Sequence, residues 1–379
     1  MNSVFVIFGT RPEAIKLAPV IRALKATLGD GSVKVVSTAQ HRQMLDQVLD
    51  IFNIVPDYDL DLMKSNQNLN DLCANIIKGL NDIFSKDRPS RVVVQGDTTT
   101  CFAGALVAFH LGIPVDHIEA GLRTGDLQAP FPEEMNRCFC DMVSSVCYAA
   151  TEKSANALRK EGVDDNRIHV TGNTVIDALL QVHKNIRTNS ELTQKLSNKF
   201  SFLDRHKHLV LVTGHRRESF GDGIRNICRA LIKISELRSD VEIFYPVHLN
   251  PNVKDAVEDT IGSHKDRIFL GEPLDYESFV YIMDRAYIIL SDSGGIQEEA
   301  PTLNRPLLVL RDKTERMEAM EAGVAKLVGT DYQNIVNETI SLLNDEEKYK
   351  KMAEAENPFG DGMASETIAS VIKSQMVIS

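Results

Sequence analysis

Short apolar runs rich in β-branched residues alternate with longer helical patterns along nearly the whole chain. A short apolar run between helices is typical of a strand that is buried on both faces, as strands are in parallel sheets. Two parallel neighbours need a crossover connection, and the intervening helices provide it. The alternation therefore predicts an α/β fold made of doubly wound parallel sheets.

The predicted elements form two series with a pause between them. The first series has strands at Ser3–Phe8, Val33–Ser37, Arg91–Gln95, Val115–Glu119 and Cys147–Ala150, and helices at Pro12–Leu28, Gln43–Phe52, Leu69–Lys86, Thr99–His110 and Glu133–Ser144. The pause follows a strand at Ile168–Thr171, and a helical pattern then covers Thr174–Ile186. The second series has strands at His208–Thr213, Val241–Pro246, Ile268–Leu270, Tyr287–Ser291, Leu307–Leu310 and Ala325–Val328.

The chain length also favours two domains, since 379 residues exceed the ~250–300 over which one core usually grows. We place the boundary near Thr171–Val175. We expect a Rossmann-like N-terminal domain over residues 1–172 and a Rossmann-like C-terminal domain over 173–364. The last helix, within residues 365–379, could pack on either domain, including back on the N-terminal one. The carboxyl ends of the strands in both domains would face a shared cleft, where doubly wound folds bind ligands.

Composition narrows the class of partner. The net charge of −11 disfavours nucleic acid as the main partner and means that an anionic ligand needs locally concentrated positive charge. No stretch approaches the ~20 apolar residues of a membrane span, and the N-terminus lacks the pattern of a signal peptide. The six cysteines are scattered, and we interpret them as reduced thiols. These features predict a cytoplasmic protein that is not inserted in a membrane.

The turn after the first strand, Gly9-Thr10-Arg11-Pro12, begins a helix that also carries Lys16. Free backbone N–H groups at a helix start favour an anion, and the two cations add to that preference. An ordinary strand–helix junction with surface charges explains the same pattern about as well.

Three carboxylates follow strands of the first series or begin a helix beside them. Asp97 and Glu119 lie at strand ends, and Glu133 begins a helix after a proline-rich loop. Helix capping and the helix dipole explain each of them singly. Because the carboxyl ends of neighbouring parallel strands meet at one edge, we expect a cluster able to separate pKa values for acid and base catalysis.

The second series carries two turns suited to phosphate. His215 lies in a basic turn after its first strand, and Ser293, Gly294 and Gly295 form a small-residue turn before a helix that carries Glu299. Such a turn lets a pyrophosphate approach backbone N–H groups. The dinucleotide fingerprint Gly-x-Gly-x-x-Gly and an acidic cluster with metal spacing are both missing, so we expect neither NAD nor a metal.

Taken together, these stretches resemble the non-hydrolysing UDP-N-acetylglucosamine 2-epimerases of bacteria. The resemblance runs in order from Phe8 to Gly362. It is carried by FGTRPEAIK, TAQHRQMLDQVL, QGDTTT, HIEAGLRTGD, FPEEMNR, TGNTVIDAL, TGHRRES, YPVHLNP, SDSGGIQEEAP and NPFGDG.

The resemblance implies a GT-B-type fold, a homodimer, and reversible conversion of UDP-N-acetylglucosamine into UDP-N-acetylmannosamine for surface polysaccharide synthesis. The reaction in the family proceeds by elimination of UDP to 2-acetamidoglucal and re-addition, with no cofactor. By resemblance, Asp97, Glu119 and Glu133 are the acid–base carboxylates, and His215 lies beside the diphosphate.

Further ligand contacts are also implied by the resemblance. Arg11 and Lys16 are similar to charge partners of the sugar nucleotide, and Phe279 and Leu274 to residues at the uracil. Ser293, Gly294 and Gly295 match the diphosphate loop, Glu299 a ribose contact and Arg316 a further nucleotide contact.

The chain departs from the family pattern beside the site, with Ala129 for a serine, Lys313 for a threonine and Met317 for a proline. These positions bear on loop geometry and leave the charged groups in place. A hydrolysing epimerase or a GT-B glycosyltransferase remains the nearest alternative, and a non-catalytic UDP-sugar sensor is a more distant one.

Overall fold

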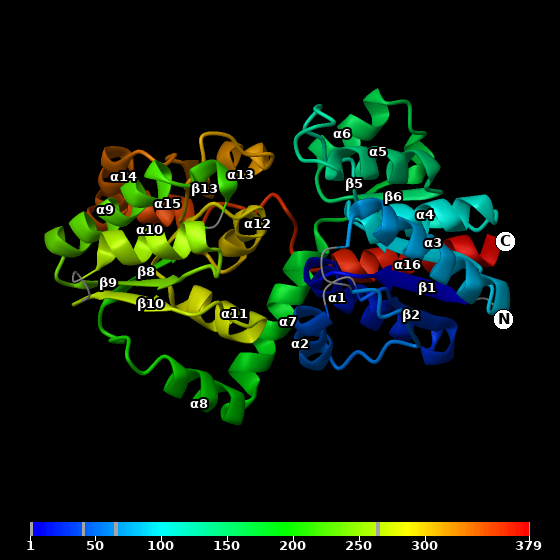
Figure 1. Cartoon of the computed structure of the whole chain (residues 1–379), viewed down its shortest axis with the longest axis horizontal. Coiled ribbons are helices and arrows are strands. Elements are labelled where there is room, and N and C mark those ends of the chain that lie inside the picture. The colour runs from blue at the N-terminus through cyan, green and yellow to red at the C-terminus, as the bar shows by residue number, and fades with distance from the viewer. Residues whose placement is uncertain (1–2, 40–41, 64–66, 215, 263–265, 379) are drawn as a thin grey trace. The chain divides into compact units, whose positions relative to one another are not determined.

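The computed structural model describes residues 3–39, 42–63, 67–214, 216–262 and 266–378 (Figure 1). The chain divides into two compact units. Unit 1 comprises Met1–Leu180 together with Phe359–Ser379, and unit 2 comprises Gln181–Pro358.

Unit 1 contains a seven-stranded parallel sheet in the order β3-β2-β1-β4-β5-β6-β7. Its strands are β1 (Val4–Phe8), β2 (Val33–Ser37), β3 (Tyr58–Asp59), β4 (Arg91–Gln95), β5 (Val115–Ala120), β6 (Val146–Ala149) and β7 (Ile168–Val170). Its helices are α1 (Arg11–Leu28), α2 (Arg42–Phe52), α3 (Leu69–Lys86), α4 (Thr99–His110), α5 (Glu133–Val143), α6 (Glu152–Lys160), the first part of α7 (Thr174–Thr188) and α16 (Ala364–Ile378).

Both faces of this sheet are buried, which explains why β1 (VFVIF) is apolar at every position and why β2, β4, β5 and β6 are rich in apolar residues. Phe5 and Ile7 of β1 pack into the cluster formed by α3 and α4, while Val4 and Val6 are equally buried on the other face. The strand order reverses between β1 and β4, so the chain leaves these two strands in opposite directions. Ligand sites of doubly wound sheets form at this switch point, beyond the carboxyl ends of the strands.

Unit 2 repeats the plan with a six-stranded parallel sheet in the order β10-β9-β8-β11-β12-β13. Its strands are β8 (His208–Thr213), β9 (Val241–Pro246), β10 (Ile268–Gly271), β11 (Ile288–Ser291), β12 (Leu307–Val309) and β13 (Ala325–Leu327). Its helices are α8 (Ser190–Lys199), α9 (Asp222–Leu237), α10 (Pro251–Ile261), α11 (Tyr276–Arg285), α12 (Gly294–Thr302), α13 (Met317–Glu321), α14 (Tyr332–Asn344) and α15 (Glu346–Ala353). Here the switch point lies between β8 and β11.

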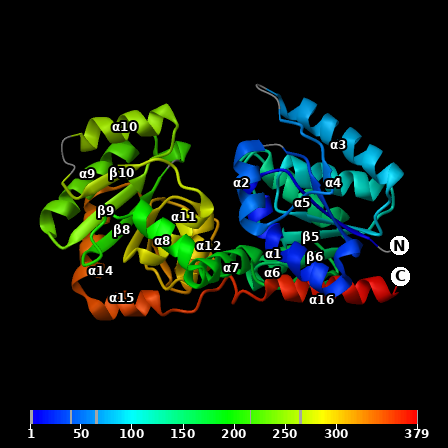
Figure 2. The same cartoon turned by 90° about the horizontal axis from the view of Figure 1, so that it is seen from below.

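The boundaries of the two units differ at two places from the domain boundaries that the sequence predicts. Unit 1 extends past residue 172 because the start of α7 packs in it, with Val175 and Ile176 buried. The chain returns to unit 1 at Phe359, before the helix expected from residue 365, and α16 packs against α1 (Figure 2). An oxygen of Asp177 accepts a hydrogen bond from the backbone N–H of Ser365 at 2.7 Å, which joins α7 to the start of α16.

Several elements were absent from the sequence prediction. They are the two-residue strand β3, the polar helices α6 and α8, and the helices α14 and α15 that follow the last predicted strand. Within the described part of the chain, no helix is both long and apolar enough to cross a membrane.

Candidate active site

The turn between β1 and α1 is closed by a buried carboxylate, Glu13. Its Oε2 accepts hydrogen bonds from the backbone N–H groups of Gly9 (3.1 Å) and Thr10 (2.8 Å) and from the Thr10 hydroxyl (2.8 Å). Its Oε1 accepts from the hydroxyl of Thr98 at 2.6 Å, and Thr98 caps α4. Glu13 thus ties the β1–α1 turn to the β4–α4 turn across the switch point. Burial raises the pKa of Glu13 to about 7, against the opposing effect of these donors.

Replacing Glu13 with glutamine is expected to flatten the pH dependence of stability. The folded pKa of Glu13 lies above its ordinary 4.5, so its contribution is fully present below about pH 4.5 and is lost as the pH rises through about 7. In that window the stability of the wild type should fall relative to Glu13→Gln, with a slope of up to about 1.4 kcal/mol per pH unit. Urea unfolding of both proteins between pH 4 and pH 8 measures this difference, and parallel curves would contradict it.

Glu119 lies in a backbone irregularity at the end of β5. The register with β6 shifts between Ile118 and Ala120, and Glu119 has a positive φ of 67°. A non-glycine residue at positive φ is strained, and such strain gathers at functional sites. The irregularity presents the carboxylate at the sheet edge.

Side chains from several segments of unit 1 donate to the carboxylate of Glu119. Lys16 contacts both of its oxygens, at 2.7 and 2.6 Å, and Asn173 donates to Oε1 at 3.1 Å. The amide of Gln95 donates to Oε2. The structure therefore brings the two predicted residues Lys16 and Glu119 together in one mostly buried ion pair. Gln95 and Asn173 lie in the motifs QGDTTT and TGNTVIDAL but were not singled out from the sequence.

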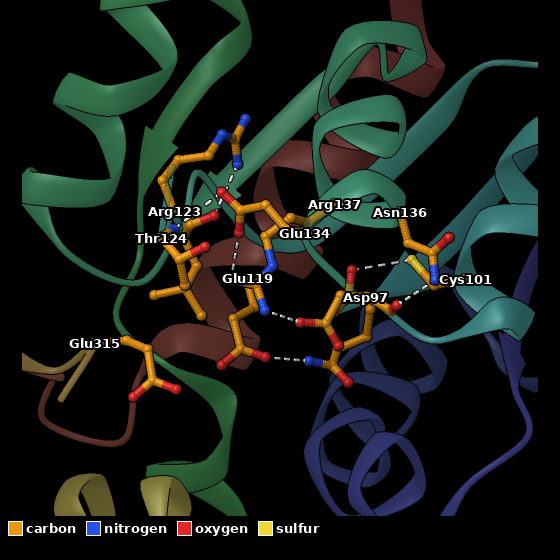
Figure 3. Close-up of polar contacts among 12 residues, drawn as sticks. Asp97, Cys101, Glu119, Arg123, Thr124, Glu134, Asn136, Arg137 and Glu315 are labelled. Atoms are coloured by element: carbon orange, nitrogen blue, oxygen red, sulfur yellow. Dashed lines mark hydrogen bonds and ion pairs between the residues drawn. The ribbon is translucent and has the colours of Figure 1, made fainter. Parts of the chain in front are cut away.

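Asp97 lies just after β4, and two residues of α5 contact it (Figure 3). Its carboxylate forms an ion pair with Arg137, and its backbone carbonyl accepts from Asn136 at 2.8 Å. Arg137 also contacts Glu134 at 3.1 Å. Asp97, Glu119 and the start of α5 therefore meet at one edge of the sheet of unit 1.

The two consecutive glutamates at the start of α5 have different surroundings. Glu134 is buried, and its Oε1 accepts from the backbone N–H groups of Thr124 (2.9 Å) and Gly125 (2.8 Å), so it supports the loop after β5. Within the described residues, Oε2 of Glu133 is buried without a hydrogen-bond partner. Glu133 is thus the member of the pair with an oxygen available to a ligand. Arg11 is half-buried at the first position of α1.

In unit 2, Arg316 lies over the start of α12. Its Nε donates to Glu298 at 2.8 Å, and a Cβ added at Gly294 would lie 3.1 Å from its guanidinium carbon. Ser293 is the N-cap of α12 and donates its backbone N–H to the Ser291 hydroxyl at 3.0 Å. The helix N-terminus and the guanidinium together form a site suited to an anion.

Glu299 is buried one turn into α12. It accepts a hydrogen bond from the Tyr276 hydroxyl at 2.8 Å. Tyr276 begins α11, so this bond joins α12 to the helix that carries Phe279 and to the loop that carries Leu274. Both of these residues are half-buried.

The predicted residue His215 lies outside the described residues. Its turn is held on either side: Asp292 accepts from the backbone N–H of Arg216 at 2.8 Å, and the Tyr245 hydroxyl donates to the carbonyl of Gly214 at 3.1 Å. Asp292 is fully buried directly after β11. It therefore joins the turns after β8 and β11, as Glu13 joins those after β1 and β4.

Cys101, His117 and Cys140 place ligand atoms within 4.8 Å of one another in the described part of unit 1. Both ring nitrogens of His117 already face hydrogen-bonding oxygens, and burial raises the pKa of the Cys101 thiol well above its ordinary value. A metal needs the thiolate and a free imidazole lone pair, so this packing favours buried thiols over a metal site.

Comparisons with known proteins show the family to which the chain belongs. A family model described as UDP-N-acetylglucosamine 2-epimerase matches residues 24–373. The chain is 50% identical to the UDP-N-acetylglucosamine 2-epimerase of Escherichia coli (strain K12) over 374 residues, which is 99% of each protein. The chain belongs to the UDP-N-acetylglucosamine 2-epimerase family.

Solved structures of other family members have the same fold. The UDP-GlcNAc 2-epimerase from Neisseria meningitidis, bound to UDP-GlcNAc, matches with a TM-score of 0.91 and 46% identity over 98% of this chain and 100% of that one. The UDP-GlcNAc 2-epimerase from Methanocaldococcus jannaschii, in complex with UDP-GlcNAc and UDP, matches with a TM-score of 0.82 and 34% identity over 98% and 99%. The predicted α/β, GT-B-type class with two Rossmann-like doubly wound parts is confirmed.

Proposed function

We propose that this epimerase interconverts UDP-N-acetylglucosamine and UDP-N-acetylmannosamine at carbon 2 without releasing the free sugar. The observation that carries the proposal is the set of carboxylates at the switch point of unit 1. Glu119 is held by Lys16, Asp97 is held by Arg137, and Glu133 keeps a buried oxygen without a partner among the described residues. Positioned acid–base groups of this kind suit a proton transfer on each face of one carbon.

The reaction proposed is elimination followed by re-addition. The hydrogen on C2 is not acidic, because its neighbour is an acetamido nitrogen and not a carbonyl carbon. In the first step a carboxylate takes the C2 proton, the C1=C2 bond forms, and the C1–O bond breaks so that UDP leaves with the electron pair. In the second step UDP adds back to C1 of 2-acetamidoglucal, and a proton is delivered to the opposite face of C2.

The residues of unit 2 are proposed to bind and stabilise the departing UDP. Ser293, Gly294 and Gly295 offer backbone N–H groups to the diphosphate, with Arg316 beside them and His215 in the turn after β8. Glu299 suits ribose hydroxyls, and Phe279 with Leu274 suits the uracil. Preorganised donors and cations stabilise charge that develops on a leaving group.

The assembly and the cellular role belong to the same proposal. We propose a cytoplasmic homodimer that needs no redox cofactor, because elimination and re-addition leave the oxidation state of the sugar unchanged. Its product would supply the synthesis of bacterial surface polysaccharide.

The deciding experiment is incubation with UDP-N-acetylglucosamine in D2O. We expect UDP-N-acetylmannosamine to form and both sugar nucleotides to gain deuterium at C2, because the abstracted proton is replaced from solvent. Proton NMR of the C2 signal follows both events. Absence of exchange at C2 would refute the epimerase assignment, and accumulation of free N-acetylmannosamine would favour the hydrolysing alternative.

A further inference from the structure

A buried histidine, His117, lies on β5 two residues before Glu119. Its Nδ1 is 2.6 Å from Oδ1 of Asp141 on α5, and its Nε2 is 2.7 Å from the carbonyl oxygen of Gly96. A carbonyl oxygen can only accept, and a carboxylate oxygen accepts when ionised. Two acceptors at hydrogen-bond distance therefore require N–H groups on both ring nitrogens, so His117 is an imidazolium.

This one ring is joined to the backbones that carry two of the three carboxylates. Gly96 immediately precedes Asp97. On the other side, Oδ2 of Asp141 accepts from the backbone N–H of Gly121 at 3.1 Å, just after Glu119. The pair thus connects the end of β4, the end of β5 and α5 in one buried network.

Other polar groups lie around the pair formed by His117 and Asp141. Arg123, in the loop after β5, contacts Oδ2 of Asp141 at 2.7 Å, and the thiols of Cys140 on α5 and Cys101 on α4 lie beside the ring. Burial would lower the pKa of His117, but Asp141 raises it to about 9. The imidazolium form is therefore retained at neutral pH, in agreement with the hydrogen-bond geometry.

We propose that His117 and Asp141 are positioning residues for the epimerisation, holding Asp97 and Glu119 at a fixed separation without touching the sugar. This inference rests on the proposed function, since it assigns these residues to the reaction at C2. Small displacements of acid–base groups are costly: a shift of about 1 Å can lower the rate ~10²-fold. A network that fixes both backbones at once therefore acts on turnover more than on ligand binding.

A second buried ion pair on the same strand provides the matched control. Asp116, the residue before His117, is fully buried and accepts from Arg91 at 2.9 Å on both oxygens. Successive residues of a strand face opposite sides of the sheet, and Arg91 is at the start of β4, far along the strand from Asp97. Asp116→Asn therefore disturbs a similar buried pair without touching the backbone at Gly96 or Gly121.

The test uses two substitutions that each keep one half of the contact. In His117→Asn the amide can replace Nδ1 and reach Asp141, and in His117→Gln it can replace Nε2 and reach Gly96. We expect kcat in both variants to fall ~10²-fold, with KM and the Kd for UDP within about twofold of the wild type. We expect Asp116→Asn to lower the Tm while its kcat per folded molecule stays close to the wild-type value.

Hydrogen–deuterium exchange keeps this inference separable from the proposed function. Peptides that cover residues 96–98 should exchange faster in His117→Asn, and peptides that cover residues 119–122 should exchange faster in His117→Gln, whatever reaction the enzyme catalyses. Unchanged exchange in these peptides, or a lowered Tm with unchanged kcat, would overturn the positioning role. If the wild-type enzyme gave no deuterium exchange at C2 of the sugar, the proposed function would be refuted. The hydrogen–deuterium exchange of the peptides would then still decide whether His117 holds the two backbones.

Should the variants fail to fold, the wild-type protein still gives an answer. Nitrogen-15 NMR of histidine-labelled enzyme is expected to show both ring N–H groups of one histidine protected from solvent exchange at neutral pH. A neutral ring at His117, with a single N–H, could hold only one of the two oxygens and would overturn the inference.

Discussion

Replacing Glu119 with glutamine is expected to lower kcat by ~10²–10⁴-fold, the contribution typical of a positioned acid or base. The amide has nearly the same shape, and its oxygen can still accept from Lys16 and Asn173. It cannot take a proton from C2 at neutral pH. Calorimetry should find UDP bound with nearly unchanged affinity, because the proposed UDP contacts are residues of unit 2.

The matched control for this prediction is Glu161→Gln. Glu161 is also a glutamate paired with a cation, Arg123, but its side chain is 44% exposed. We expect this variant to retain wild-type turnover. Loss of UDP binding in Glu119→Gln, or an equal loss of turnover in Glu161→Gln, would reassign Glu119 from proton transfer to binding or to general stability.

Replacing Gly121 with alanine is expected to destabilise unit 1 by ~2–5 kcal/mol. Gly121 has a φ of 81°, where a side chain costs ~1–2 kcal/mol, and its added Cβ would overlap the backbone carbonyl of Ser154. Backbone atoms cannot move aside as a flexible side chain does, so overpacking adds a further ~1–3 kcal/mol.

Gly162→Ala separates the two contributions to this loss. Gly162 has a nearly equal φ of 85°, but its added Cβ would meet no atom within 4 Å. We expect this variant to lose only ~1–2 kcal/mol. Thermal or urea unfolding of both variants measures the difference, and equal losses would show that the contact with Ser154 carries no cost.

Most of the fold could be predicted from the sequence because the strands are buried on both faces. Helices α6 and α8 were not predicted, since each is short and buries few apolar side chains. The strand β3 has two residues, too few for any periodic pattern. A pattern of apolar residues indicates which segments bury their side chains. It therefore misses helices and strands that bury few apolar side chains.

The candidate site could be predicted in part, for a related reason. Asp97 and Glu119 follow strands, and the geometry of a parallel sheet brings strand ends to one edge. Their partners Arg137 and Asn173 come from α5 and from the segment after β7, and only the folded structure shows these contacts. His117 was not singled out from the sequence, because nothing local in the sequence indicates that its ring meets Asp141.

The return of the chain to unit 1 at Phe359 affects the order in which the protein can be completed on the ribosome. Unit 2 is continuous in sequence, whereas unit 1 needs α16, which is synthesised only after all of unit 2. Ile368, Ala369 and Ile372 of α16 are fully buried in the finished unit. Until they arrive, the face of α1 that α16 covers is exposed, and an incompletely folded unit with an exposed apolar surface is prone to aggregation. We therefore expect a chaperone that covers this face of nascent unit 1 to reduce aggregation until α16 is synthesised.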